Sequence, residues 1–428
     1  MSGLFWRMAR QGLGSGLQVI DDVRTSIIEE PYTRDRSSII LPPEMHRDRI
    51  DWILLLSALS LLGIGLLMVL SSTSFTAQTA HGNPFGRFSA QSLRGFVGLV
   101  LLFVASRMDY RWLSTWSPWI AIGSALLLAA VFLPGIGEAS KGSQRWLEVG
   151  PVRFQPIELA RVGLIVYLAR LLSKSPQKIE RFTTGPLPAF LAAGVFMGLI
   201  IVQPSLGSAL TLALTTLAMC LAAGMKRQHF LLVCLVGVIG LTLVLVFKSE
   251  SYQVQRLMGF QKIWTNDPDR HGVTYQVRQS LLALGSGGLD GLGIGNSQQK
   301  RFFLPDAHTD FIFSIVGEEL GLIGTLSVLI LFAILIGRGL RIAAAAEDRF
   351  GYLLAAGLTV NFMIYATINM GVTMALLPVT GLPLPFVSYG GSALIANLVA
   401  VGLLLSISRR CGASYALAPA RRHRRGNA

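Results

Sequence analysis

Apolar segments of about 20 residues recur along the chain between residues 51 and 410. A hydrocarbon core about 30 Å thick is crossed by about 20 apolar residues of α-helix. Inside a membrane the backbone polar groups need partners within the protein, and a helix supplies them internally. We therefore predict an all-α polytopic integral membrane protein with about ten transmembrane helices. The predicted helices begin near Asp51, Gln91, Leu113, Gln155, Pro186, Leu206, Gln228, Asp310, Gly351 and Leu384.

The composition excludes an ordinary soluble globule. Of the 428 residues, 52% are hydrophobic and only 14% are charged, and the mean hydropathy is +0.56. A soluble domain usually carries about 25% charged residues. The net charge of +14 would suit a nucleic-acid partner. However, Lys and Arg also collect in the cytoplasmic segments of membrane proteins, which explains the charge without nucleic acid.

Placing the N-terminus in the cytoplasm puts most basic clusters on the cytoplasmic side, as the positive-inside rule requires. The long outer loop is an exception, but long loops escape this rule. Both termini are therefore predicted to be cytoplasmic, and the basic tail is expected to contact anionic lipid. The residues placed inside are Arg107, Arg111, Lys174, Lys178, Arg181, Lys226, Arg227, Arg338, Arg341, Arg349, Arg409, Arg410, Arg421, Arg422, Arg424 and Arg425.

Three parts follow along the chain. Residues 1–50 are polar and mixed and lack the apolar core of a signal peptide, so they are expected to be a largely disordered cytoplasmic extension. Residues 51–410 form the predicted ten-helix membrane domain, and residues 411–428 form the basic cytoplasmic tail. Two outer loops stand out, at about 135–154 and 248–307. The second lies between predicted helices 7 and 8, and ordered loops of such length usually have a function.

A cluster of polar residues stands at the start of an apolar run, where His308, Thr309 and Asp310 are followed by Phe311 and Ile312. A carboxylate is costly at the boundary between water and hydrocarbon, so its presence there indicates a site. We predict that Asp310 is a general base at the outer boundary. The alternative is that Thr309 or Asp310 caps the helix that follows, and the two roles are compatible.

Two further sets of charges fall within predicted helices. Eight residues of continuous helix would place Glu318 about 12 Å deeper than Asp310, with Glu319 on the opposite helix face. Pairing of these glutamates with a cation at the inner face is expected. Glu158 and Arg161 lie three residues apart in the fourth predicted helix, so they share a face and predict an internal ion pair.

The first outer loop contains a basic patch made of Lys141, Arg145 and Arg153, beside Trp146. Arginine binds a diphosphate through two parallel hydrogen bonds, so the patch predicts a clamp for an anionic head group. The alternative is an ordinary solvated loop.

Residues 377–392, with the sequence LPVTGLPLPFVSYGGS, interrupt a helix at membrane depth with three prolines and a glycine pair. Such backbone persists in a membrane only where protein buries it or where it lines a wet cavity. The alternative is a tight turn between two helices.

The sequence contains no recognisable cofactor motif. The glycine-rich run 285–296 fits neither nucleotide-binding pattern, GxGxxG or GxxxxGK[ST], and is expected to lie flat against the membrane. The histidines are scattered and neither HExxH nor CxxC occurs, so no protein metal site is predicted. A divalent cation, Mg²⁺ or Mn²⁺, would nevertheless be compatible with a diphosphate. Cys220, Cys234 and Cys411 fall in helices or the tail, so no disulfide is expected.

Four motifs together resemble the SEDS family (shape, elongation, division and sporulation), the peptidoglycan glycosyltransferases typified by FtsW and RodA. The resemblance extends from about Asp51 to Arg410. The motifs are GSQRW (142–146) with QPIEL (155–159), QPSLG (203–207), LPDAHTDFIF (304–313) with GEELG (317–321), and LPFVSYGGS (384–392).

Membership would imply ten helices around a groove in the bacterial cytoplasmic membrane and polymerisation of lipid II into glycan strands, for septal or lateral cell-wall synthesis. The resemblance matches Asp310 to the family's essential outer-loop aspartate. It also matches Arg145 and Trp146 to outer-loop residues, and Glu158 and Arg161 to a charged pair in the fourth helix. His308 and Ser388, within the motifs, join the candidate substrate-binding residues. The implied partners are a bitopic class B penicillin-binding protein and other divisome or elongasome membrane proteins.

Two positions depart from the family pattern. Ser205 stands where members usually have Asp, and Thr380 stands where division members often have Lys. Residues 295–297 and 305–308 resemble the division branch, whereas residues 378–383 resemble the elongation branch. The division branch is favoured.

The resemblance and the residues lead to one mechanism and two rivals. Asp310 would take a proton from an acceptor hydroxyl, whose oxygen attacks the anomeric carbon of the lipid-linked donor with inversion. Lys141, Arg145 or Arg153 would stabilise the departing diphosphate. A lipid II flippase or transporter is the first rival, because it shares the many helices and the broken one. A non-catalytic scaffold of the division machinery is the second.

Overall fold

The computed structural model describes residues 50–79, 85–133, 137–140, 143–150, 152–247, 272–300, 303–305 and 307–411. The predicted cytoplasmic extension and the basic tail lie almost entirely outside these residues. Lys141 and most of the first half of the long outer loop also lie outside them.

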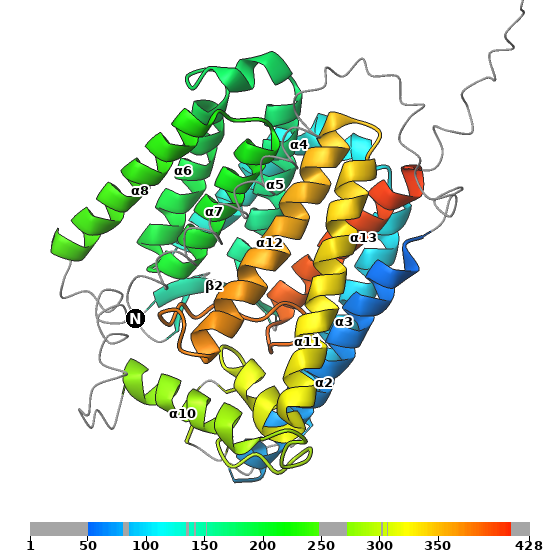
Figure 1. The fold of residues 1–428 in the computed structure, drawn as a ribbon, viewed down its shortest axis with the longest axis vertical. Helices are drawn as coiled ribbons and strands as arrows, with labels where there is room; N and C mark the ends of the chain where they lie inside the picture. Colours follow the sequence, from blue (N-terminus) through cyan, green and yellow to red (C-terminus); the bar gives the residue numbers. More distant parts are fainter. Residues whose placement is uncertain are drawn as a thin grey trace, which may run out of the picture. The chain divides into compact units, whose positions relative to one another are not determined.

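A bundle of ten long helices makes up most of the described part of the chain (Figure 1). Six of them are long and apolar enough to cross a membrane, namely α2, α3, α4, α11, α12 and α13. Shorter apolar helices occur at α6, α7 and the first part of α8. The predicted class, an all-α polytopic membrane protein, is confirmed. The helices are α2 (Trp52–Thr79), α3 (Gly86–Arg107), α4 (Tyr110–Ala130), α5 (Pro156–Ser173), α6 (Pro186–Val202), α7 (Leu206–Ala222), α8 (Arg227–Phe247), α11 (Ile312–Ala345), α12 (Arg349–Thr373) and α13 (Gly391–Arg410).

Two helix starts differ clearly from the predictions. Helix α3 begins at Gly86 rather than near Gln91, and α13 begins at Gly391 rather than near Leu384. The second difference has a clear cause, because Pro383 and Pro385 cannot donate backbone hydrogen bonds and delay the helix. Residues 377–390 are irregular instead.

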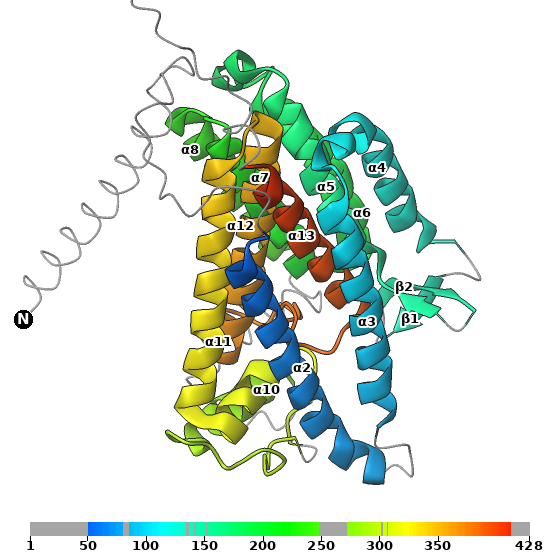
Figure 2. The same ribbon diagram turned by 90° about the vertical axis from the view of Figure 1, so that its right-hand side faces the viewer.

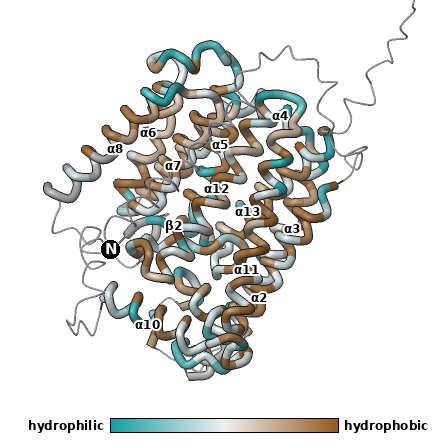
Figure 3. The backbone as a smooth tube through the Cα atoms, in the orientation of Figure 1, coloured by the Kyte–Doolittle hydropathy of each residue, from teal (hydrophilic) through white to brown (hydrophobic). Residues whose placement is uncertain are grey.

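Helix α12 occupies the centre of the bundle and packs against α5, α7 and α11 (Figure 2). Helix α13 packs along α3, and α11 packs along α2. Most residues of α12 and α13 are buried, whereas most residues of α3 and α4 are partly or fully exposed. Figure 3 shows hydrophobic residues running along these helices and hydrophilic residues gathering at the ends of the bundle.

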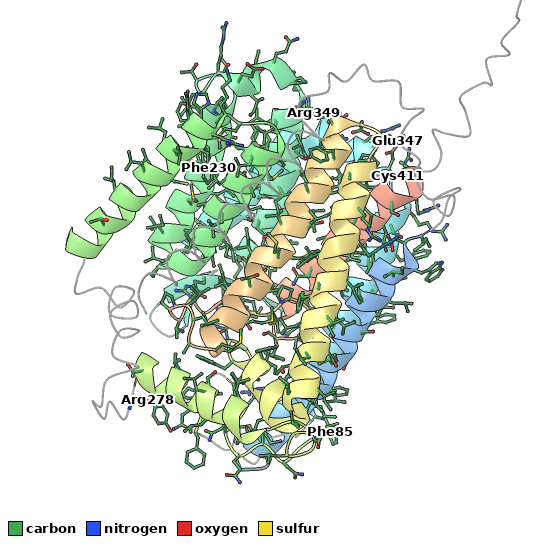
Figure 4. The ribbon with its side chains drawn as sticks, viewed as in Figure 1. Phe85, Phe230, Arg278, Glu347, Arg349 and Cys411 are labelled. Atoms are coloured by element: carbon green, nitrogen blue, oxygen red, sulfur yellow. The ribbon has the colours of Figure 1, made fainter. Side chains whose placement is uncertain are left out.

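Basic and acidic side chains pair at the end of the bundle where α2 and α12 begin, which we call the inner end. Arg338 contacts Asp51 at 2.7 Å, and Arg111 contacts Glu347 at 2.7 Å. Figure 4 shows Glu347, Arg349 and Cys411 at this end and Phe85 and Arg278 at the opposite, outer end. Arg111 and Arg338 are two of the residues that the positive-inside rule assigned to the cytoplasmic side, which motivates the name of this end.

The outer end carries a small sheet and a short helix. Strands β1 (Gly137–Ser140), β2 (Ser143–Val149) and β3 (Val152–Phe154) form an antiparallel sheet in that order. The first outer loop is thus a compact hairpin structure and not an irregular connection. Helix α10 (Val273–Ser286) belongs to the second outer loop.

Helix α11 is broken at Gly321, where φ is 65° and ψ is −159°, a backbone conformation that is essentially restricted to glycine. The glycine-rich run fills this break. Leu322 N–H donates to the carbonyl of Gly288 at 3.0 Å, and Leu292 N–H donates to that of Glu318 at 2.9 Å. The backbone of the run thus completes the hydrogen bonding of the interrupted helix, and its expected position flat against the membrane stays a prediction.

Candidate active site at the outer end of the bundle

The break divides α11 into an outward leg (residues 312–320) and an inward leg (residues 322–345). Helix α12 runs outward, and its Asn369 donates to the carbonyl of Asp310 at 2.9 Å. Ser280 donates to the carbonyl of Thr373, one turn further out, and its hydroxyl lies 2.5 Å from that of Ser314. The chain therefore climbs outward from Asp310 to Ser314 and turns back at Gly321.

The position of Glu319 confirms this direction. Ser71, near the outer end of α2, donates to Glu319 at 2.6 Å. Gly65 of the same helix lies against the backbone of Phe386 and is about 9 Å nearer the inner end. The loop next to Thr309 thus sits deeper than Glu319. The expectation that Glu318 lies deeper than Asp310 is wrong, because it assumed one continuous inward helix.

Three backbone contacts hold the His308–Asp310 segment in place. The Ser388 hydroxyl donates to the carbonyl of Thr309 at 2.5 Å. Tyr389 N–H donates to the carbonyl of His308 at 2.9 Å. Asn369 bridges the carbonyls of Asp310 and Leu382, at 2.9 and 2.7 Å. The proline-rich loop is therefore a buried cradle for this segment and not a simple turn between helices.

The start of α11 lies directly after the polar cluster, and the capping role of Thr309 or Asp310 stays an alternative. Helix α11 begins at Ile312, so Phe311 occupies the N-cap position and Asp310 precedes it. Asp310 and its two predecessors are partly exposed, whereas Phe311, Ile312 and Phe313 are buried. The polar cluster consequently reaches an accessible space while the residues after it anchor the helix in the core.

Two arginines from the start of α3 reach this segment. The guanidinium of Arg87 lies 3.5 Å from Nε2 of His308. Arg94 donates to the hydroxyl of Tyr389 at 3.4 Å, and the Tyr389 and His308 rings lie 5.6 Å apart between centroids. These cations come from a part of the chain that the sequence did not connect with the site.

Two members of the predicted basic patch, Arg145 and Arg153, lie in the sheet, whereas Lys141 lies outside the described residues. Arg145 on β2 donates to the carbonyl of Gln203 at 3.1 Å and also to that of Pro204. The guanidinium of Arg153 on β3 stacks over the ring of Trp146 at 4.8 Å. Arg145 thus ties the sheet to the turn between α6 and α7, and Arg153 forms a stacked pair with Trp146.

The same turn meets the proline-rich loop. Ser205, which replaces the acidic residue usual in the family motif, donates to the hydroxyl of Ser208 at 2.9 Å. Gly207 packs directly on the backbone of Thr380, where an added Cβ would lie 2.8 Å from the carbonyl oxygen. All four sequence motifs therefore form one connected structure at the outer end, from the sheet through the turn to the Asp310 segment.

Glu158 and Arg161 lie at the start of α5 and form an ion pair at 3.1 Å, with both side chains fully buried. Arg161 also donates to Asn397 and stacks on the ring of Tyr365 at 4.2 Å. Gln155, just before this helix, donates from its backbone to Ser392 at 2.9 Å. The pair thus connects α5 with α12 and α13 beneath the proline-rich loop.

Glu318 and Glu319 bind the second outer loop. Glu319 pairs with Lys300 at 2.7 Å, so its cation comes from the outer loop and the expected inner-face partner is wrong. Glu318 accepts from the hydroxyl of Ser297 and from the backbone N–H of Gln298 at 2.8 Å. Both carboxylates thus bind groups of the second outer loop at the break in α11.

Among the residues that the structure describes, no three His, Cys, Asp or Glu side chains converge as a metal site would require. The free cysteines do not approach one another as a pair. In the described part of the chain, Asp310 shares a segment with His308, whose ring meets Arg87, so a carboxylic acid and cations lie near one another. Such an arrangement suits removal of a proton beside a developing anion.

A family model described as "Cell cycle protein", covering FtsW, RodA and SpoVE, matches residues 51–412. The chain belongs to the FtsW/RodA/SpoVE family. The resemblance predicted from the four motifs is confirmed, and the matched range agrees closely with the predicted membrane domain of residues 51–410.

Individual members of the FtsW/RodA/SpoVE family are similar over most of the chain. "Probable peptidoglycan glycosyltransferase FtsW" of Geobacter metallireducens is 41% identical over 366 residues, 85% of this chain and 96% of that one. Stage V sporulation protein E of Bacillus subtilis is 38% identical over 360 residues, 84% of this chain and 97% of that one. The relatives named FtsW agree with the favoured division branch.

Two solved structures of the family share the fold. A chain from a structure described as coordinating polymerization and crosslinking in a peptidoglycan synthase complex superposes with a TM-score of 0.67 at 27% identity. That match covers 85% of this chain and 98% of the other. RodA of Thermus thermophilus has a TM-score of 0.62 at 29% identity, with 84% and 97% covered.

The sequence analysis did not identify several residues that lie far from Asp310 in the chain but contact its segment or the residues around it. Arg87 and Arg94 carried a usable signal, because they lie seven residues apart on one helix face at an end where the positive-inside rule expects few cations. Asn369 gave a weaker sequence signal, because it is a buried amide within an apolar helix. Lys300 and Ser71 carried none, since only the fold brings them to Glu319.

Proposed function

We propose that this chain polymerises lipid II into glycan strands with Asp310 as the general base. The chain is a peptidoglycan glycosyltransferase, as its family membership and its relatives indicate. The observation that supports the residue assignment is the cradle around Asp310. Ser388 and Asn369 fix the backbone on both sides of it, and its neighbours His308 and Tyr389 meet two arginines.

The reaction needs one base and several cations. The Asp310 carboxylate accepts the proton of an acceptor sugar hydroxyl, and the freed oxygen forms a bond with the anomeric carbon of the lipid-linked donor. The bond from that carbon to the diphosphate breaks, and polyprenyl diphosphate leaves with the electron pair. A positioned base contributes about 10²- to 10⁴-fold to such a step. Because attack and departure occur on opposite faces, the anomeric configuration inverts.

The departing diphosphate requires charge neutralisation close to the base. Arg87 and Arg94 are the arginines that contact the His308–Tyr389 pair, so we assign the leaving diphosphate to them. The polymerisation brings two lipid-linked substrates together. The sheet residues Arg145, Trp146 and Arg153, with Lys141, which the sequence analysis connected with the departing diphosphate, become the candidates for the second substrate. His308 and Ser388 then shape the space between the two.

A divalent cation, if used, would enter with the substrate. Mg²⁺ binds mainly through phosphate oxygens, water and one or two carboxylates. Asp310 is the carboxylate of this site that would face it. The chain's own residues supply the cradle, the base and the arginine contacts in either case.

The setting of the enzyme follows from its topology. We place the protein in the bacterial cytoplasmic membrane with both termini inside, so the outer end faces the extracytoplasmic space where glycan strands grow. The partner proposed for it is a class B penicillin-binding protein, which would crosslink the strands. A solved relative in a complex that couples polymerization with crosslinking supports this assignment.

The test is a polymerisation assay with purified lipid II, comparing the wild-type chain with Asp310→Asn. We expect the rate at saturating lipid II to fall by at least about 100-fold, because the amide cannot accept the proton. Asp290→Asn is the matched control, since Asp290 is exposed in the glycine-rich run, and it should retain the wild-type rate. Normal glycan strands from Asp310→Asn would refute the assignment.

A further inference from the structure

A buried charge pair lies outside the proposed site and takes no part in the chemistry above. Lys300 Nζ lies 2.7 Å from Glu319 Oε1, and both side chains are almost fully shielded, with 2% and 0% exposed. Ser71 contacts both charges, donating to Glu319 at 2.6 Å and accepting from Lys300 at 3.0 Å. Burying two charges is costly, and a pair held by this many hydrogen bonds indicates a specific role.

The pair joins three elements that are distant in the sequence. Ser71 belongs to α2, Lys300 to the second outer loop and Glu319 to the outward leg of α11. Next to it, Glu318 accepts from Ser297 and from the backbone of Gln298. The loop end at residues 297–300 is therefore fixed to α2 and α11 from two sides.

Nine residues lie between Lys300 and Asp310, of which the structure describes all but 301, 302 and 306, and two sets of contacts link the two ends. Leu304 N–H donates to the carbonyl of Gln299, the residue before Lys300, at 2.9 Å, so Leu304 is tied to this loop end. Leu304 and Ala307 are buried in one apolar cluster with Phe311, the residue after Asp310. A shift of Lys300 would move this cluster, and the Asp310 backbone with it.

The segment that presents Asp310 consequently has two anchors. Ser388 and Asn369 form the inner one, close to the base itself. The Lys300–Glu319 pair forms the outer one. Loss of the outer anchor would keep every residue of the proposed site. It would change only the position of the His308–Asp310 segment.

We infer that Lys300 and Glu319 are positioning residues whose ion pair sets the placement of Asp310, an inference that rests on the proposed function of that carboxylate. They touch no substrate. A displacement of about 1 Å at a reacting group can reduce a rate by about 100-fold. The pair should therefore govern the catalytic rate more than the affinity for lipid II.

The experiment removes both charges at once, because a single replacement would leave an unpaired buried charge and impair folding. The variant is Lys300→Met with Glu319→Gln. The matched control is Arg338→Met with Asp51→Asn, which removes a second 2.7 Å ion pair of α11, made at the inner end with the residue just before α2. Lys300→Arg keeps the charge and serves as the conservative rescue.

Two quantities are measured on folded, monodisperse protein. The first is kcat and KM for lipid II polymerisation. The second is hydrogen–deuterium exchange of the backbone amides in residues 303–311. The Lys300/Glu319 double variant should lose about 10- to 100-fold in kcat with KM within about twofold, and its 303–311 amides should exchange faster. The control pair should change neither quantity, and Lys300→Arg should retain most of the activity.

Wild-type kcat and exchange in the double variant would overturn the inference. A loss of activity that merely follows a lower melting temperature, with exchange raised throughout the protein and equally in the control, would overturn it too. The exchange measurement is independent of the chemistry. If Asp310→Asn proved fully active while the 303–311 amides still loosened, the proposed role of Asp310 would fail and the outer anchor would stand.

Discussion

Ser388 and Thr309 are 79 residues apart in the chain, yet the Ser388 hydroxyl donates to the carbonyl of Thr309 at 2.5 Å. The same hydroxyl accepts from the backbone N–H of Leu384 at 2.8 Å, which closes the proline-rich loop on itself. One side chain thus fixes both the loop and the residue that precedes the proposed base. This relationship explains why a proline-rich interruption sits deep in the bundle.

Replacing Ser388 by Ala should therefore reduce catalysis while the fold persists. The substitution removes the hydroxyl partner of a partly buried carbonyl and of a buried N–H, and loss of a partner costs a buried group about 1–3 kcal/mol. We expect kcat for lipid II polymerisation to fall by about 10-fold or more. Ser406→Ala is the control, because its hydroxyl makes the same kind of bond, to Met108 at 2.6 Å, at the inner end. Equal losses in the two variants would argue against a special role of Ser388.

A glycine next to Arg94 offers a test of the proposed diphosphate contacts that leaves every charge in place. A Cβ on Gly391 would lie 2.2 Å from Cδ of Arg94, whereas a Cβ on Gly390 meets only Ala393 at 3.7 Å. Gly391→Ala should displace the guanidinium and raise KM for lipid II by about 10-fold, as expected for a lost hydrogen bond to a charged group. Gly390→Ala should leave KM within about twofold. Steady-state kinetics decide the matter, and an unchanged KM in Gly391→Ala would remove Arg94 from the diphosphate site.

The break in α11 predicts a strong effect of one glycine on stability. Gly321 has a backbone conformation that other residues adopt at a cost of about 1–3 kcal/mol, and an added Cβ would lie 2.3 Å from the carbonyl oxygen of Leu289. Gly321→Ala should lower the unfolding free energy by about 3 kcal/mol, seen as a lower melting temperature in detergent. Gly337, further along the same helix, has open space around it, so Gly337→Ala should be neutral or slightly stabilising. Similar melting temperatures for the two variants would contradict the described break.

Local spacing predicted several features of this structure correctly. The three-residue interval between Glu158 and Arg161 was enough to place them on one helix face, and the apolar runs identified the bundle. Predictions failed where one residue redirects the chain. Nothing near Gly321 in the sequence distinguishes a helix break from an ordinary membrane glycine, so the depth of Glu318 was reversed. The Arg94–Tyr389 and Lys300–Glu319 contacts depend on tertiary folding, which local patterns do not encode.

The central claim, that Asp310 is the base of a lipid II polymerase, is tested most directly in proteoliposomes that report two activities together. Labelled lipid II would be followed both for incorporation into glycan strands and for movement between leaflets, with the wild-type chain and with Asp310→Asn, each beside a class B penicillin-binding protein. The account predicts glycan strands with the wild-type chain, none above background with Asp310→Asn, and no protein-dependent movement of lipid II with either. Movement between leaflets without polymer in the wild type, or equal polymer from both chains, would contradict it.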